Sequence, residues 1–167
     1  MKTIRLQKMT FSGVEKTLYY KAVQLLAQRS HSTVELKQKL VIYASKKYDN
    51  LDSLSKHIEA VINHCLSHHW LDDQDYINQY IAIRARKGYG KHRIVMELKQ
   101  KGLDSSLISS LIHQKEIDWV QLAYRQVKKK CNSFKNADAQ QKVKIRQFLL
   151  YRGFSHGDIC DVFTLFR

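Results

Sequence analysis

The sequence ELKQK occurs at residues 35–39 and again at residues 97–101. A third stretch, residues 142–163, aligns without a gap with residues 91–112, so that apolar positions stay apolar and basic positions stay basic. The pairs include Ile94 with Ile145, Leu98 with Leu149, Arg93 with Lys144, Lys101 with Arg152 and Gly102 with Gly153. Repetition of this kind predicts a chain built by duplication of one small helical unit, and such arrays favour binding surfaces over single deep pockets.

Apolar residues recur at helical spacing throughout the chain, and no stretch alternates with a period of two residues. Residues that favour helix starts and helix ends stand between the helical stretches. Ser32 and Glu35 have the spacing of a capping box, Asp72 and Asp104 can cap helices, and Gly102 and Gly153 suit left-handed helix ends. The pattern predicts an all-α protein of nine helices in three triplets.

The predicted organisation is a basic N-terminal arm at residues 1–14 followed by three-helix repeats at residues 15–71, 72–115 and 116–167. At 167 residues in all, each repeat is too small to bury much core alone. We therefore expect tandem repeats that form an elongated, curved array. The net charge of +14 is spread along the chain, which suits a long polyanion such as nucleic acid, or an acidic protein groove.

The three cysteines, Cys65, Cys131 and Cys160, are widely separated, and two of them fall in phase with apolar stripes. This predicts reduced thiols in or near the core, as expected in the cytoplasm. No apolar run follows the basic residues of the N-terminal arm, so we expect neither a signal peptide nor a membrane span.

The run RARKGYGKHRIVMELKQKG at residues 84–102, with Leu71-Asp72-Asp73 before it and His31-Ser32 upstream, resembles the RecX family of bacterial recombination regulators. Residues 142–154 resemble the third repeat of the enterobacterial-type members. The resemblance extends from about residue 18 to the C-terminus. It implies tandem three-helix repeats and a modulator that binds the RecA filament and usually restrains its ATP hydrolysis and strand exchange. Single-stranded DNA and also duplex DNA are the further expected partners, and we expect a monomer.

The central cluster of candidate contact residues lies between residues 84 and 101, a stretch that contains seven basic residues and one acidic residue, Glu97. Tyr89 stands between two glycines in this run, where its ring could stack on a partner. The other interpretation is a turn that only reverses the chain, with Tyr89 packed on the core. The candidate residues here are Arg84, Arg86, Lys87, Tyr89, Lys91, Arg93, Lys99 and Lys101.

A second basic cluster follows in the last repeat. Lys144 and Arg152 occupy the repeat positions of Arg93 and Lys101 and are its strongest candidates. The candidate residues here are Lys142, Lys144, Arg146 and Arg152. If both clusters line one face, many weak charge contacts could add up along a filament groove.

No motif for catalysis is present, since the sequence lacks a phosphate-binding loop, a nucleophile elbow and a His-Glu-x-x-His zinc motif. His57, His64 and His68 share one helical face but lack the second half of a structural zinc site. We therefore predict no enzyme activity, no cofactor and no metal. The alternative function is a helix-turn-helix protein that binds duplex DNA, but residues 105–114 are rich in Ser, Leu and Ile rather than in base-reading side chains.

Overall fold

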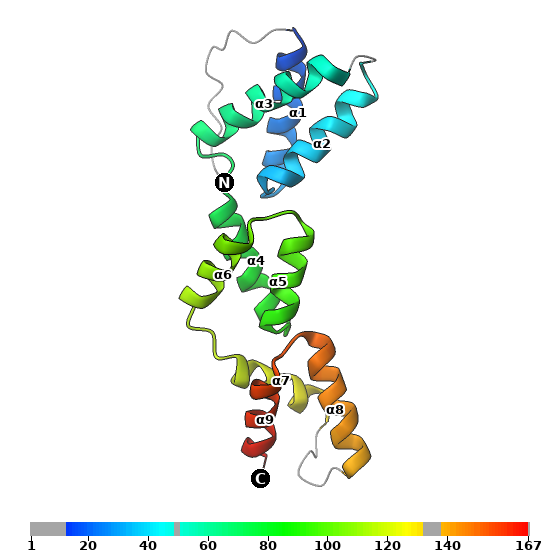
Figure 1. Cartoon of the computed structure of the whole chain (residues 1–167), viewed down its shortest axis with the longest axis vertical. Coiled ribbons are helices and arrows are strands. Elements are labelled where there is room, and N and C mark those ends of the chain that lie inside the picture. The colour runs from blue at the N-terminus through cyan, green and yellow to red at the C-terminus, as the bar shows by residue number, and fades with distance from the viewer. Residues whose placement is uncertain (1–12, 49–50, 132–137, 167) are drawn as a thin grey trace. The chain divides into compact units, whose positions relative to one another are not determined.

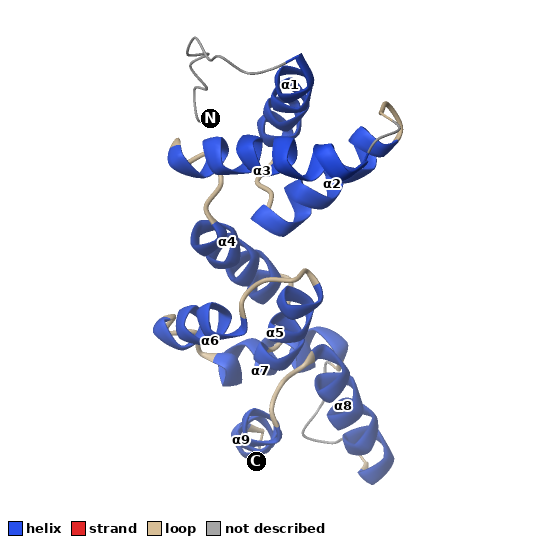
Figure 2. Cartoon of the chain, turned by 45° about the horizontal axis from the view of Figure 1, so that its top comes forward, coloured by secondary structure: helices blue, strands red, loops and turns tan. Residues whose placement is uncertain are grey.

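The computed structural model describes residues 13–48, 51–131 and 138–166. Within these ranges the secondary structure consists of nine α-helices and no strand (Figures 1 and 2). The helices are α1 (Gly13–Gln28), α2 (Thr33–Ser45), α3 (Leu51–Ser67), α4 (Asp73–Arg86), α5 (Lys91–Gln100), α6 (Ser105–Gln114), α7 (Trp119–Lys130), α8 (Ala139–Arg152) and α9 (His156–Leu165). The predicted all-α class is confirmed. Of the predicted arm at residues 1–14, only Gly13 and Val14 lie inside the described residues, where they begin α1.

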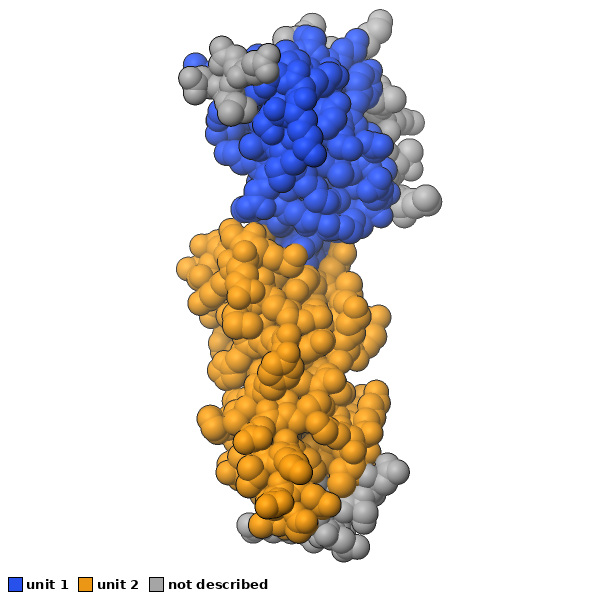
Figure 3. Space-filling view, turned by 90° about the vertical axis from the view of Figure 1, so that its right-hand side faces the viewer, with its two compact units in different colours: residues 1–76 blue, residues 77–167 orange. Residues whose placement is uncertain are grey.

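The chain divides into two compact units, residues 1–76 and residues 77–167, which Figure 3 colours separately. This division falls inside α4. The boundaries predicted for the three repeats, at residues 15, 72 and 116, stay a prediction. None of the described helices has both the length and the apolar character that crossing a membrane requires.

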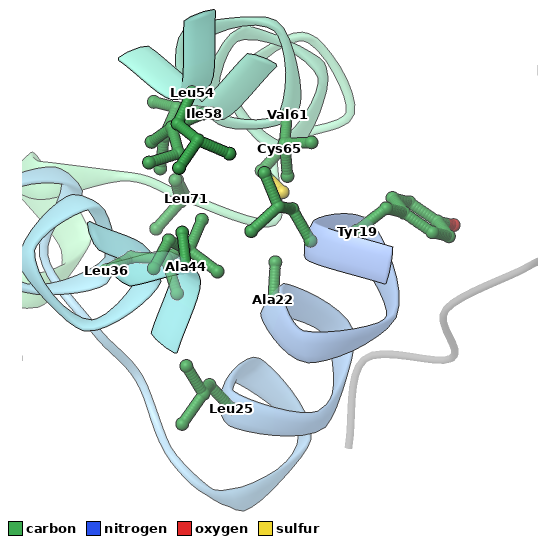
Figure 4. Packing of buried hydrophobic residues seen from close by; sticks show 13 residues of the cluster. Tyr19, Ala22, Leu25, Leu36, Ala44, Leu54, Ile58, Val61, Cys65 and Leu71 are labelled. Carbon is green, nitrogen blue, oxygen red and sulfur yellow. The ribbon is translucent and has the colours of Figure 1, made fainter. Parts of the chain in front are cut away.

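In the first unit, α1, α2 and α3 pack against one another around a single apolar core. Leu18 and Ala22 come from α1, Leu36 and Leu40 from α2, and Val61 from α3, and all five are fully buried. Figure 4 shows side chains of the three helices converging, with Leu71 joining them from beyond α3. Burial of this apolar surface is the main stabilising contribution to the unit.

Helix ends in the first unit follow the predicted capping only in part. Ser32 caps α2, since its hydroxyl accepts a hydrogen bond from the Glu35 amide at 3.2 Å. The reciprocal half of the predicted capping box is wrong, because the Glu35 carboxylate pairs with Arg29 and with Lys39 at 3.5 Å instead. Asp72 caps α4 by accepting from the Asp75 amide at 3.0 Å.

In the second unit, α7, α8 and α9 pack together around Val127, Leu149, Phe154 and Val162. Asp104 caps α6 by accepting from the Leu107 amide at 2.7 Å, as predicted. Gly102 and Gly153 both adopt left-handed backbone conformations, with φ of 77° and 87° respectively, after α5 and α8. Both helix ends were predicted as such.

The thiols differ from one another in their surroundings. Cys65 is fully buried and burial raises its pKa to about 12, and Cys131 is half-buried. Cys160 is exposed, so a core or near-core prediction is wrong for that residue. It follows the buried Ile159 by one position, and that step turns a side chain about 100° around the helix, away from the core.

Candidate binding surface around Tyr89

The turn between α4 and α5 lies against the turn between α8 and α9. The Gly90 amide donates to the Arg152 carbonyl at 2.8 Å, and the His92 amide donates to the Gly153 carbonyl at 3.0 Å. A Cβ atom on Gly90 would lie closer than 3.0 Å to the Gly153 backbone. Glycine at residue 90 therefore permits the close approach of two turns that are far apart in the sequence.

Glu97 is the acceptor at the centre of the first basic cluster. Its carboxylate accepts hydrogen bonds from Arg84 Nε at 2.7 Å, from the Tyr80 hydroxyl at 2.9 Å and from Arg93 Nε at 3.1 Å. Burial by itself would raise the pKa of Glu97, but these hydrogen bonds hold the pKa below its ordinary value. The carboxylate thus stays charged and fixes the two arginines.

The ring of Tyr89 is covered by guanidinium groups. Arg84 Cζ lies 3.7 Å from the ring centroid, Arg93 Cζ lies 5.0 Å away and Arg152 Cζ lies 5.4 Å away. Cations over an aromatic face are attracted by its quadrupole. We call Tyr80, Arg84, Tyr89, Arg93, Glu97 and Arg152 the Tyr89 cluster. A partner contact for Tyr89 itself stays a prediction, and the ring already has neighbours within the chain.

Two arginines of the Tyr89 cluster also bond to backbone carbonyls across the junction of the turns. Arg152 donates from one nitrogen to the carbonyls of Lys87 at 3.2 Å and Gly88 at 3.1 Å. Arg93 donates to the carbonyl of Tyr151 at 3.1 Å. Charge-assisted bonds of this kind stabilise more than neutral ones. These side chains therefore hold α5 and α8 in a fixed relationship within the second unit.

Six other predicted contact residues are exposed to solvent: Arg86, Lys87, Lys99, Lys142, Lys144 and Arg146. None of the six forms an ion pair within the part of the chain that the structure describes. Arg146 Cζ lies 5.4 Å from the Phe163 ring centroid, so its position is guided by α9. Exposed lysines and arginines without acidic partners produce an unneutralised positive field over this surface.

The two remaining predicted residues, Lys91 and Lys101, are half-buried. Lys91 Nζ lies 3.2 Å from Nε2 of His113 on α6. Lys101 Nζ lies 5.6 Å from the centroid of the Tyr80 ring. Both lysines are thus partly occupied by neighbours inside the second repeat.

Tyr151 is a surface residue that is absent from the predicted set. Its side chain is 74% exposed, and Arg93 Cζ lies 4.8 Å from the ring centroid. In the repeat alignment Tyr151 stands where the second repeat has Gln100. An aromatic residue at a polar repeat position was the available signal, and an exposed ring beside an arginine is a usual element of stacking surfaces.

The histidines of α3 have partners of other kinds. His57 Nδ1 lies 2.9 Å from a Glu15 oxygen, and the rings of His64 and His68 have centroids 4.0 Å apart. His68 Nδ1 lies 3.0 Å from the His64 carbonyl. Among the described residues, no three or more His, Cys, Asp or Glu side chains lie together in an arrangement that could hold a metal ion.

Two segments of the chain match models of known protein domains. A family model of the second three-helix domain of RecX matches residues 72–111, and a model of the third three-helix domain of RecX matches residues 116–163. These matched segments contain both basic clusters and the Tyr89 cluster.

Similar proteins extend over most of the chain. Regulatory protein RecX of Pectobacterium atrosepticum is 37% identical over 161 residues, which cover 92% of this chain and 99% of that protein. Regulatory protein RecX of Salmonella heidelberg is also 37% identical, over 148 residues that cover 87% of this chain and 89% of that protein.

Solved structures have the same fold. The crystal structure of RecX from Lactobacillus salivarius superposes with a TM-score of 0.74 at 21% identity, covering 92% of this chain and 96% of that chain. A second crystal structure, of regulatory protein RecX, gives a TM-score of 0.73 at 18% identity, with 89% and 72% covered. On the sequence identity and the family models together, the chain belongs to the RecX family of regulatory proteins.

Proposed function

We propose that the chain binds the RecA recombinase filament, together with the DNA that the filament carries, and lowers its ATP hydrolysis and strand exchange. Membership of the RecX family supports a regulatory role of this kind. In this proposal the chain acts by occupying a surface of the filament, without catalysing a reaction of its own.

The observation that carries the proposal is the set of exposed, unpaired cations on the second unit. Lys87 and Lys99 supply it from the second repeat, and Lys142, Lys144 and Arg146 supply it from the third. A filament on DNA presents repeated negative groups. Many modest contacts between these groups and the exposed cations together give a substantial affinity. Each contact releases counterions, which makes such binding sensitive to salt.

The Tyr89 cluster supports the proposal in a different way. The three arginines of the cluster already have partners within the chain, namely Tyr89, Glu97 and backbone carbonyls. Their first role is therefore to hold the second and third repeats in a fixed arrangement. A fixed spacing between the exposed lysines of α5 and α8 reduces the entropy lost on binding. We therefore assign positioning to the cluster and partner contact to the exposed cations.

The alternative of a helix-turn-helix protein on duplex DNA is disfavoured by the exposed faces of α6 and α9. In α6 the exposed residues are Ser105, Ser106, Ser109, Ser110, His113 and Gln114. The exposed face of α9 carries Asp161, whose carboxylate would meet phosphates. A recognition helix reads bases mainly with Arg, Asn or Gln. The two faces offer neither Arg nor Asn, and the side-chain amide of Gln114 donates to Ser110 Oγ at 3.3 Å.

The test is an ATPase assay on RecA filaments assembled on single-stranded DNA, with increasing amounts of the chain. We expect inhibition by the wild type and its loss when Lys142, Lys144 and Arg146 are all changed to Glu. Because these side chains are exposed and only Arg146 approaches an aromatic ring, that of Phe163, the melting temperature should change little. Inhibition that survives the triple change at an unchanged melting temperature contradicts the assignment of these residues.

The dose dependence separates two ways of acting. If the chain blocks the filament groove, inhibition should require nearly one molecule for each stretch of groove it can occupy. If it caps a growing filament end, far less protein should suffice. Failure of the wild type to inhibit at any dose would refute the proposal as a whole.

A further inference from the structure

An open groove of about 380 Å³ lies in the second unit, between the C-terminal half of α4, the segment before α7 and α7 itself. Among the residues predicted as partner contacts, Arg86 alone lines it. The groove therefore represents a feature of the surface that neither the basic clusters nor the Tyr89 cluster explains.

The floor of the groove is aliphatic. Ala82 and Ala85 of α4 contribute to one side, and Ile117 and Leu122 contribute to the other. Ala85 is buried, whereas the other three are half-buried and keep part of their surface open to solvent. An open apolar floor of this size can accept a side chain from a partner and gain the free energy of its burial.

Cations flank this floor. Arg86 and Arg125 are exposed, and neither forms an ion pair among the described residues. Lys115 also lines the groove, with its Nζ donating to the Asn78 carbonyl at 3.1 Å. An unpaired guanidinium can bind a carboxylate through two parallel hydrogen bonds.

The one acid of the lining is already in use. Asp118 caps α7, with its Oδ1 accepting from the Gln121 amide at 2.8 Å. Among the described residues it forms no ion pair with Arg86 or Arg125, so both guanidinium groups are available to carboxylates of a ligand.

The chemistry of the lining favours a peptide over a nucleic acid. None of the described residues that line the groove is aromatic, so they offer a base no ring to stack on. An aliphatic floor contributes nothing to the binding of a phosphate backbone, whereas it can accept an apolar side chain of a peptide. A carboxylate-rich segment with one apolar residue satisfies both the floor and the arginines.

We propose that this groove binds an acidic segment of a protein partner, with an aliphatic side chain of the segment on the floor and its carboxylates on Arg86 and Arg125. The proposal goes beyond the proposed function, because it specifies a peptide chemistry whichever protein supplies the segment. Its test contains no RecA, so that the two proposals can fail independently.

The probe is a fluorescein-labelled peptide, Ser-Glu-Glu-Leu-Glu-Glu-Ser, and the measurement is fluorescence anisotropy with the full chain. Replacing Arg125 by Glu should weaken binding about tenfold or more, since it removes a charge-assisted contact and adds repulsion. Arg125→Gln should weaken binding less, and it serves as a second variant should the reversal disturb folding. Lys56→Glu is the matched control. Lys56 is exposed on α3, and this substitution changes the net charge of the chain by the same amount as Arg125→Glu.

Two further probes make the result decisive. A peptide with Ser in place of Leu should bind several-fold more weakly if the aliphatic floor contributes. A labelled oligothymidylate should lose no more affinity on Arg125→Glu than on Lys56→Glu.

Equal weakening of the Glu-Leu peptide by Arg125→Glu and Lys56→Glu would mean general attraction to a basic protein and would overturn the proposal. Indifference of that peptide to Arg125→Glu would overturn it as well. If instead the oligothymidylate is the probe that depends on Arg125, the groove binds nucleic acid and the peptide proposal is wrong.

Discussion

The guanidinium carbon of Arg84 lies 3.7 Å from the centre of the Tyr89 ring, while the same guanidinium pairs with Glu97. One side chain thus joins the end of α4, the turn after it and the middle of α5. Because Arg93 and Arg152 approach the same ring, Tyr89 connects the second repeat with the third. Its structural contribution can be measured separately from any contact with a partner.

Replacing Tyr89 by Ala should lower the free energy of unfolding by about 2 kcal/mol, since it removes the ring on which three guanidinium groups lie. Tyr151→Ala is the control, because that ring is 74% exposed and its loss should change stability by no more than about 0.5 kcal/mol. Urea titrations followed by circular dichroism provide the comparison. Equal effects of the two substitutions would contradict a structural role for Tyr89.

Replacing Gly90 by Ala should separate the two turns, since the new Cβ would lie closer than 3.0 Å to the Gly153 backbone. We expect a loss of stability of about 2 kcal/mol or more, as for other overpacked sites. Gly157→Ala is the control: it lies in the first turn of α9, where the nearest atom to a new Cβ is 3.7 Å away. That substitution should be neutral or slightly stabilising. A Gly90→Ala protein as stable as the wild type would contradict the close contact of the turns.

The sequence predicted the helices and most of their ends, because caps and left-handed glycines act over a few residues. Asp104, Gly102 and Gly153 belong to this class, and all three have the predicted roles. The sequence could not predict that Arg93 and Arg152 bond to carbonyls of another repeat. Residue type gives a charge, but the acceptors are Tyr151 for Arg93 and Lys87 and Gly88 for Arg152, residues distant in sequence that only the packing of the repeats brings near.

The same limit explains the partial capping box in the first unit. Ser32 and Glu35 have the correct spacing for a capping box, and the Glu35 amide donates to the Ser32 hydroxyl. The Glu35 carboxylate, however, binds Arg29 rather than the Ser32 amide, because a guanidinium offers charge-assisted hydrogen bonds. Local spacing identifies a possible partner, whereas the choice among partners depends on every donor within reach.

The pair of Glu35 with Arg29 predicts a pH dependence of stability in the first unit. The hydrogen bond from Arg29 lowers the pKa of Glu35 from its ordinary 4.5 to about 2. A carboxylate with a lowered pKa in the folded state stabilises fully above its unfolded pKa, and this stabilisation is lost as the pH falls through the folded pKa. Glu35→Gln should therefore cost about 1 kcal/mol at pH 7, after allowance for the exposure of Arg29, and almost nothing near pH 2.

Glu59→Gln is the control for the Glu35 experiment. Glu59 pairs with Lys37 at 3.2 Å, but both side chains are about half exposed. Exposed pairs of this kind contribute little, so the substitution should change the unfolding free energy by no more than about 0.5 kcal/mol at either pH. Urea unfolding at pH 7, 4 and 2 measures both variants. A cost for Glu35→Gln that does not shrink toward low pH would contradict the role assigned to its charge.

The exposed lysines of α8 predict how DNA binding should depend on salt. Lys142 and Lys144 are exposed and make no ion pair among the described residues, so each can meet a phosphate without first breaking an internal contact. Every phosphate neutralised on a single strand contributes about 0.7 to the slope of log affinity against log salt. Changing both lysines to Gln should therefore reduce the slope by about 1.4, with no change in melting temperature.

The matched control is the double variant Lys16→Gln with Lys56→Gln. Both of these lysines are exposed and lie outside the predicted set, so this variant should leave the slope nearly unchanged. The measurement is anisotropy of a labelled oligothymidylate from about 50 to 200 mM salt. A slope that both double variants reduce equally would mean that the charge of the whole chain, rather than the face of α8, attracts the strand.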